Sequence, residues 1–148
     1  MSAEVPRNPW LIAGGLLSAA AAALHLAIIA GGPDWYRFFG AGEGMARMAE
    51  RGMARPTLFA IGIAAILAVW AAYAFAGAGL IRRLPLMRTA LVAISAVYLL
   101  RALAPLPLLL LHPHQVDAFL LWSSAIVLVY GLCYAIGTSR AWAALSAP

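Results

Sequence analysis

The sequence contains no lysine and only five acidic residues, so its ten basic residues are all arginines. Charged residues make up 10% of the chain, whereas they make up about a quarter of a soluble domain. Hydrophobic residues make up 65%, and the mean hydropathy is +0.91. So few charges cannot cover the surface of a water-soluble fold, so we expect lipid to be the solvent.

Further absences exclude several classes of function. The lone cysteine, Cys133, lies in an apolar run and has no second thiol for a disulfide or a thiol relay, so it is expected to be buried. The segment GAGEG at residues 40–44 has neither the preceding strand nor the spacing of a phosphate-binding loop. The arginines stand beside apolar runs, where they suit lipid headgroups better than nucleic acid.

Four apolar runs are long enough to cross a membrane, which requires about 20 residues each. The predicted spans are residues 10–31, 56–79, 89–111 and 118–138. We therefore expect an all-α fold, an integral membrane four-helix bundle in which residues 1–148 form a single membrane domain. Pro105 and Pro107 predict that the third helix ends or kinks near Ala104. Stripes of small residues predict close helix packing in the first two spans: Gly14, Ser18 and Ala22, then Ala65, Ala68, Ala72 and Ala76.

The stretch between the first two spans is the only long polar interruption. Its start, Gly31–Gly32–Pro33, is typical of a helix end, and Asp34 is the expected N-cap of the next helix. Residues 42–53 are predicted to form an amphipathic interfacial helix, because apolar and charged side chains separate on opposite faces. Glu43 and Arg47 stand four residues apart, in the order that favours an ion pair.

Arginine positions favour an orientation with both termini in the cytoplasm of a bacterial inner membrane. The short connector between spans two and three carries three arginines and no acid. The side with the termini holds Arg7, Arg82, Arg83, Arg88 and Arg140, and the other side holds Arg37, Arg47, Arg51 and Arg55.

Arg101 is the most informative residue, because a charge inside a span requires a stabilising partner. It could bond to carbonyl groups freed by the prolines, reach the interface, contact a partner subunit, or pair with Glu43 or Asp34. His25 is either a packing histidine or a ligand or proton-transfer group. Six residues are candidates for a polar cluster or ligand-binding pocket: His25, Glu43, Arg101, Trp35, Trp70 and Tyr98.

A metal site is a weaker alternative. Its ligands would be His25, His112, His114 and Asp117, which are acceptable residue types without a recognised metal-binding spacing. His25 and His112 are the only pair that could hold a haem. The sequence contains no nucleophile, base and orienting acid in the order of a familiar catalytic triad. It indicates no particular cofactor.

Three function classes are compatible with these features. The first is binding or transport of a hydrophobic small molecule or lipid in an intramembrane pocket. The second is an accessory or structural subunit of a larger membrane complex. The third is a membrane-embedded enzyme that uses His25, Glu43 and Arg101 on a lipid. Membrane lipids are the expected partners, and nucleic acid is not expected as one. A homo-oligomer or a larger membrane complex is compatible with the sequence. The order of four short spans with a polar first connector resembles small bacterial four-helix membrane proteins such as the DoxX type, in topology only.

Overall fold

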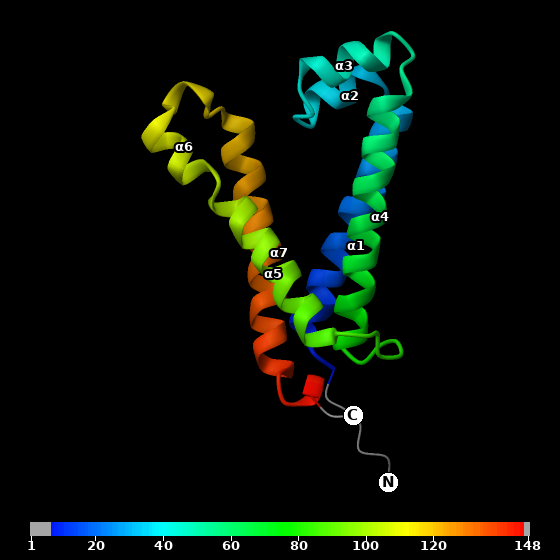
Figure 1. Cartoon of the computed structure of the whole chain (residues 1–148), viewed down its shortest axis with the longest axis vertical. Helices are drawn as coiled ribbons and strands as arrows, with labels where there is room; N and C mark the ends of the chain where they lie inside the picture. The colour runs from blue at the N-terminus through cyan, green and yellow to red at the C-terminus, as the bar shows by residue number, and fades with distance from the viewer. Residues whose placement is uncertain (1–6, 147–148) are drawn as a thin grey trace. The chain divides into compact units, whose positions relative to one another are not determined.

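A computed structural model describes residues 7–146, and within that range all of the regular secondary structure is helical, with no strand. Four helical segments are long and apolar enough to cross a membrane, which suggests a multi-pass membrane protein. Figure 1 shows the helices in chain order. Their bounds are α1 (Pro9–Gly31), α2 (Pro33–Phe38), α3 (Glu43–Glu50), α4 (Ala54–Gly77), α5 (Met87–Leu103), α6 (Pro105–Leu111), η1 (Pro113–Gln115), α7 (Ala118–Ala141) and η2 (Ala144–Ser146).

The candidate spans agree closely with the four apolar runs of the sequence. The third, Met87–Leu111, is interrupted where expected: α5 ends at Leu103 and α6 begins at Pro105. Pro105 and Pro107 lack the N–H groups that would continue the helical hydrogen bonds. Asp117 caps α7, because its carboxylate accepts a hydrogen bond of 2.7 Å from the Leu120 N–H.

The chain divides into two compact units, and each is described by itself. The α2/α3 unit is Ser18–Val69. The α5/α7 unit consists of the described residues up to Leu17 together with those from Trp70 onward. The unit boundaries fall inside α1 and α4, so each of these helices contributes one part to each unit.

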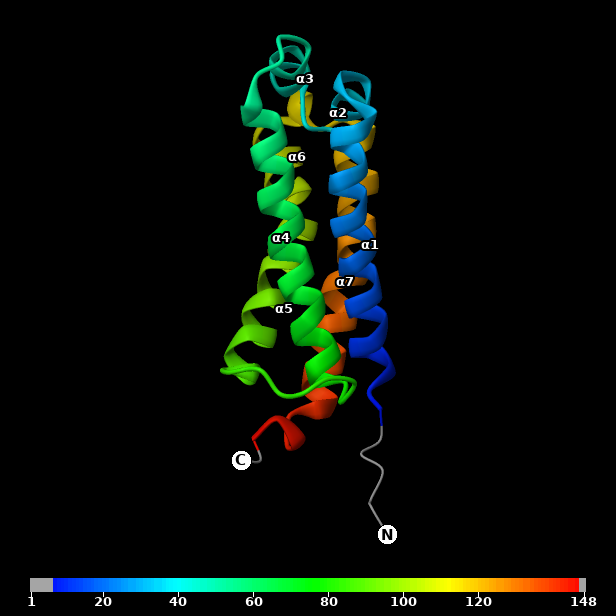
Figure 2. The ribbon, with the colours of Figure 1, turned by 90° about the vertical axis from the view of Figure 1, so that its right-hand side faces the viewer.

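In the α5/α7 unit, α5 and α7 pack as an antiparallel pair (Figures 1 and 2). Leu99 on α5 lies against Gly131 on α7, where a Cβ atom would come within 2.8 Å of the leucine. The first turns of α1 also pack on α7, since a Cβ on Gly137 would lie 2.7 Å from Leu11. Leu11, Leu91 and Tyr134 are completely buried and form the centre of this unit.

In the α2/α3 unit, the second part of α1 runs beside the first part of α4 (Figure 2). Ser18 and Ala22 on α1 are buried, as the small-residue stripe predicted. The stripe predicted on α4 is wrong in part, because Ala65 and Ala68 are exposed. The buried face is the neighbouring one, and it carries Ala60, Ala64 and Leu67 in this unit.

Helices α2 and α3 pack against each other around a small apolar core. Ile28, Tyr36 and Ala46 are buried there. The prediction that Asp34 is the N-cap of the helix after the first span is wrong. Gly32 takes that position because its φ of 71° suits glycine and because Pro33 begins the helix. Asp34 lies in the first turn instead, where a carboxylate favours the helix dipole.

Candidate ligand-binding site

Arg101 lies near the middle of the third candidate span and donates to two serines on α7. Its Nη1 is 2.8 Å from Ser124 Oγ, and its Nη2 is 3.1 Å from Ser123 Oγ. The side chain lies about 21 Å along α5 from the start of the helix, at about 1.5 Å per residue. The antiparallel register of α5 and α7 thus brings together residues that are 23 and 22 positions apart.

The two hydroxyl groups solvate the guanidinium without neutralising it. Every ion pair among residues 7–146 involves Arg37 or Arg47, so Arg101 has no carboxylate partner there. Asp117 is the only acidic residue of the described part of the α5/α7 unit, and its carboxylate caps α7. A guanidinium has further N–H donors beyond the two used here. The position can therefore accept an anionic group or a strong hydrogen-bond acceptor.

Four aromatic side chains of the same unit lie next to this arginine along the helix pair. Tyr98, one turn before Arg101 on α5, is at the centre of the group and is 95% buried. Its ring centroid is 4.9 Å from Trp70 on α4, 5.5 Å from Tyr130 and 5.3 Å from Tyr134. The Trp70 and Tyr130 rings meet Tyr98 edge to face, the arrangement that aromatic quadrupoles favour.

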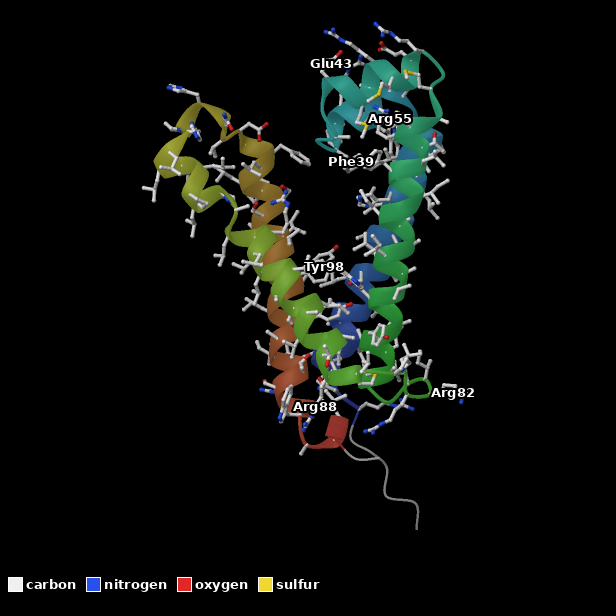
Figure 3. The ribbon with its side chains drawn as sticks, viewed as in Figure 1. Phe39, Glu43, Arg55, Arg82, Arg88 and Tyr98 are labelled. Carbon is white, nitrogen blue, oxygen red and sulfur yellow. The ribbon has the colours of Figure 1, made fainter. Side chains whose placement is uncertain are left out.

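A hydroxyl-to-carbonyl bond fixes part of the cluster. The Tyr134 hydroxyl group donates a hydrogen bond of 3.0 Å to the Trp70 carbonyl oxygen, and this bond links α7 to α4. Figure 3 shows Tyr98 projecting from α5 among side chains of the spans. Trp70 and Tyr130 remain partly exposed beside it. The helix pair therefore presents a cationic donor one helical turn from a firmly held aromatic surface.

The remaining pocket candidates lie in the α2/α3 unit, where each has local partners. His25 is half-buried, and its Nδ1 lies 2.8 Å from the Ala21 carbonyl oxygen, one turn earlier in α1. This is the single hydrogen bond expected of a packing histidine. Trp35 packs on Phe39 with 5.7 Å between ring centroids, and 42% of its surface is exposed.

Glu43 belongs to a surface network centred on Arg37. Arg37 donates to Glu43 at 2.9 Å, to Asp34 at 3.1 Å and to Glu50 at 2.5 Å. Arg47 donates to Glu43 at 3.1 Å, which confirms the predicted pair. Hydrogen bonds from Arg37, and then from Arg47, lower the pKa of Glu43 from 4.5 to about 2. The bonds to Glu43 and Glu50 raise the pKa of Arg37. Arg101 and Glu43 thus each have polar partners within their own units.

The predicted metal ligands do not gather into a site. Within residues 7–146, no group of three or more His, Cys, Asp or Glu side chains is placed to hold a metal ion. His112 and His114 are exposed at η1. Asp117 is used as a helix cap.

Sequence reasoning named Arg101, Trp70 and Tyr98 but left Ser123 and Ser124 out of the site. Serines inside an apolar helix commonly bond to their own backbone, and Ser123 does donate a hydrogen bond of 3.2 Å to the Leu120 carbonyl oxygen. The available signal was a pair of hydroxyl groups inside an otherwise apolar span, facing a span with an unpaired arginine.

Comparison with protein families, characterised proteins and solved structures found no match to this chain. The topological resemblance to small four-helix membrane proteins consequently assigns no role to any residue.

Proposed function

We propose that this protein binds, and carries or presents, an amphipathic small molecule or lipid inside the membrane. Arg101 would bind an anionic or strongly accepting head group. The aromatic cluster of Trp70, Tyr98, Tyr130 and Tyr134 would contact the apolar part, since ligand sites combine an apolar lining with a few placed polar groups.

The observation that carries this proposal is the uncompensated charge of Arg101. A charged side chain at the centre of a span costs about 2.5–3.5 kcal/mol on insertion scales. Hydrogen bonds to charged groups contribute about 1.5–3 kcal/mol each, so two serines offset this cost. They leave the positive charge itself unpaired, and an anionic ligand would supply the counter-charge.

The membrane arrangement forms part of the same proposal. The four spans would form a bundle in a bacterial inner membrane, with both termini in the cytoplasm. The paired helices α2 and α3 would lie in the opposite interface. Exposed Trp35 and Phe38 support that placement, because aromatic side chains concentrate at membrane interfaces.

The test is mass spectrometry of lipids and small molecules that co-purify with the full chain in mild detergent. We expect an anionic amphiphile to be enriched over the bulk membrane extract. Arg101→Gln should lower its content about tenfold, the effect of losing one charge-assisted contact. Arg51→Gln, which removes an exposed arginine outside the spans, is the matched control and should leave the content unchanged.

Two results would overturn the proposal. One is a co-purifying lipid profile equal to that of the bulk membrane. The other is an enriched molecule retained equally by Arg101→Gln and by the native chain. Migration of the native chain only within a larger complex, with no enriched amphiphile, would favour an accessory subunit instead. Turnover of an added lipid that is lost in His25→Ala or Glu43→Gln with the fold intact would favour an enzyme.

A further inference from the structure

An open depression on the surface of the α2/α3 unit is lined almost entirely by aromatic rings. This feature, the α2 depression, is formed by Asp34, Trp35, Phe38 and Phe39. The first three belong to α2, and Phe39 follows directly after it (Figure 3). Among the described residues, Asp34 is the only charged one in this lining. The depression therefore combines one carboxylate with three aromatic side chains.

The three rings stand at steep angles to one another. The Phe38 and Phe39 rings meet edge to face, with 5.0 Å between their centroids and 83° between their planes. The Trp35 ring is tilted by 48° against Phe39, with 5.7 Å between the centroids. Such angles turn the ring faces in different directions, and each face carries the negative part of the aromatic quadrupole. A cation bound in the depression can thus contact more than one ring face.

The backbone and the core hold these rings in place. A Cβ atom on Gly31, at the end of α1, would lie 2.1 Å from Trp35 Cγ, so the indole ring lies directly against the helix backbone. Phe39 packs against the small apolar core of this unit. On the outer side, 42% of Trp35 and 74% of Phe38 are exposed. The rings are therefore fixed on one side and open to a ligand on the other.

The negative charge of Asp34 is only partly balanced. Its Oδ1 accepts a hydrogen bond of 3.1 Å from Arg37, and no described residue donates to its Oδ2. Arg37 shares its single charge among three carboxylates, and its contacts with Glu43 and Glu50 are 2.9 Å and 2.5 Å. The Asp34 side chain is 93% exposed. Asp34 can therefore attract a second cation.

The lining indicates a quaternary ammonium group rather than a metal ion or a primary ammonium group. A hard metal ion such as calcium takes about six to eight oxygen ligands, and residues 7–146 hold no group of three or more side chains placed to bind a metal. A primary ammonium group has several N–H donors, for which one carboxylate is not enough. A quaternary ammonium group has none, and its methyl groups suit an aromatic wall.

The same lining favours a ligand without a phosphate group. The choline head group of a phospholipid carries a phosphate next to its ammonium group, and a phosphate would be repelled by Asp34. The α2 depression has no basic residue in its lining to bind that phosphate. The neighbouring Arg37 is already occupied by three carboxylates. A small soluble compound therefore fits the site better than a lipid head group.

We propose that the α2 depression binds a small quaternary ammonium compound that carries no phosphate, for which choline is the simplest probe. The ring faces of Trp35 and Phe38 would contact its methyl groups, and Asp34 would balance its charge. This site uses none of the residues around Arg101 and does not depend on the function proposed above.

The test is a ¹H–¹⁵N NMR titration of the full chain in a maltoside detergent, observed at the indole N–H signals of its five tryptophans. Trp35→Phe removes one of these signals and so assigns it. We expect choline to shift the Trp35 signal saturably and to leave the others unchanged. The uncharged carbon analogue of choline should bind at least about threefold more weakly, because it makes no cation–π contact.

Two variants of exposed residues test the two kinds of contact. Phe38→Leu keeps an apolar side chain without a ring and should weaken choline binding about threefold. Asp34→Asn should weaken it about threefold, as expected for an exposed ion pair. The matched controls are Phe59→Leu, which removes an exposed ring of α4, and Asp117→Asn, which removes a carboxylate but keeps a helix cap. Each should change the affinity less than about 1.5-fold. Unchanged indole signals of the other tryptophans check that every variant is folded.

Several results would overturn the proposal. Equal affinity for choline and its uncharged analogue would show an apolar depression without cation recognition. Native affinity in either Phe38→Leu or Asp34→Asn, or an equal loss in the controls, would exclude the assigned contacts. Phosphocholine bound as tightly as choline would show that the site accepts a lipid-type head group. A Trp35 signal that does not move at millimolar choline would show that no such ligand binds.

Discussion

Arg37 and Arg101 show how one residue type is used in two different environments. Arg37 lies on the outer side of α2 with Asp34, Glu43 and Glu50 around it, so its charge is more than balanced. Arg101 lies within a candidate span and has only hydroxyl partners. The ion pairs of Arg37 have a structural role, because they link α2 to α3. The hydroxyl partners of Arg101 leave a charge for a ligand to balance.

The Arg37 network predicts an acid-sensitive contact between α2 and α3. Glu43 has a pKa of about 2 in the folded protein and 4.5 without its partners. Because the folded value is the lower one, the network is fully stabilising above about pH 4.5 and weakens as the pH falls towards 2. A carboxyl ¹³C NMR titration of the glutamates in detergent measures this. In Arg37→Gln the Glu43 midpoint should move towards 4.5, and an unchanged midpoint would contradict the assignment of its partners.

Individual elements were the most predictable part of the fold, and the reasons are local. Apolar length defined the four candidate spans, and Pro105 defined the break in the third. Capping was predictable at Asp117 but not at Asp34, because Pro33 begins α2 one residue earlier and Gly32 supplies the backbone conformation. The packed face of α4 was not predictable, since alanines occur on several of its faces and only the partner helix selects one.

Glycines at helix contacts give a prediction about these elements. A Cβ on Gly137 would lie 2.7 Å from Leu11 Cγ and 3.0 Å from the Leu11 backbone nitrogen. Backbone atoms cannot move aside cheaply, so Gly137→Ala should destabilise the α1–α7 contact by about 1–3 kcal/mol. Gly62 on α4 has no atom within 4 Å of such a Cβ. Gly62→Ala should therefore be neutral or stabilise by up to about 1 kcal/mol.

The buried thiol of Cys133 allows both glycine variants to be measured. It is the only cysteine in the chain, so a thiol-reactive fluorophore reports its exposure as the temperature rises. We expect the midpoint of labelling to fall for Gly137→Ala and to stay or rise for Gly62→Ala. A fall of the same size in both variants would show that helix contact is not the cause.

At the scale of the whole molecule, the candidate site was only partly predictable. Arg101 stood out because a charge inside a span requires a partner, and Tyr98 because aromatic side chains suit the lining of a ligand pocket. Their neighbours on α7 come from positions more than 20 residues away, and the antiparallel register of two helices selects them. Hydropathy reports which residues enter the membrane. It does not report which residues of two spans face each other.

The arrangement of the connectors about the membrane gives the last prediction. If all four candidate spans cross, the first and third connectors lie on one side of the membrane and the second connector lies on the other. Starting from Cys133→Ala, single cysteines are introduced as Glu50→Cys, Arg82→Cys and Gln115→Cys, at positions outside the candidate spans. In intact cells, a membrane-impermeant maleimide should label the cysteines at 50 and 115, whereas the one at 82 should react only after lysis.

Labelling of the cysteine at 82, with those at 50 and 115 protected, would keep four spans and reverse the proposed orientation. Opposite accessibility of 50 and 115 would show that α4 and the α5–α6 segment do not both cross, because an even number of crossings returns the chain to the same side.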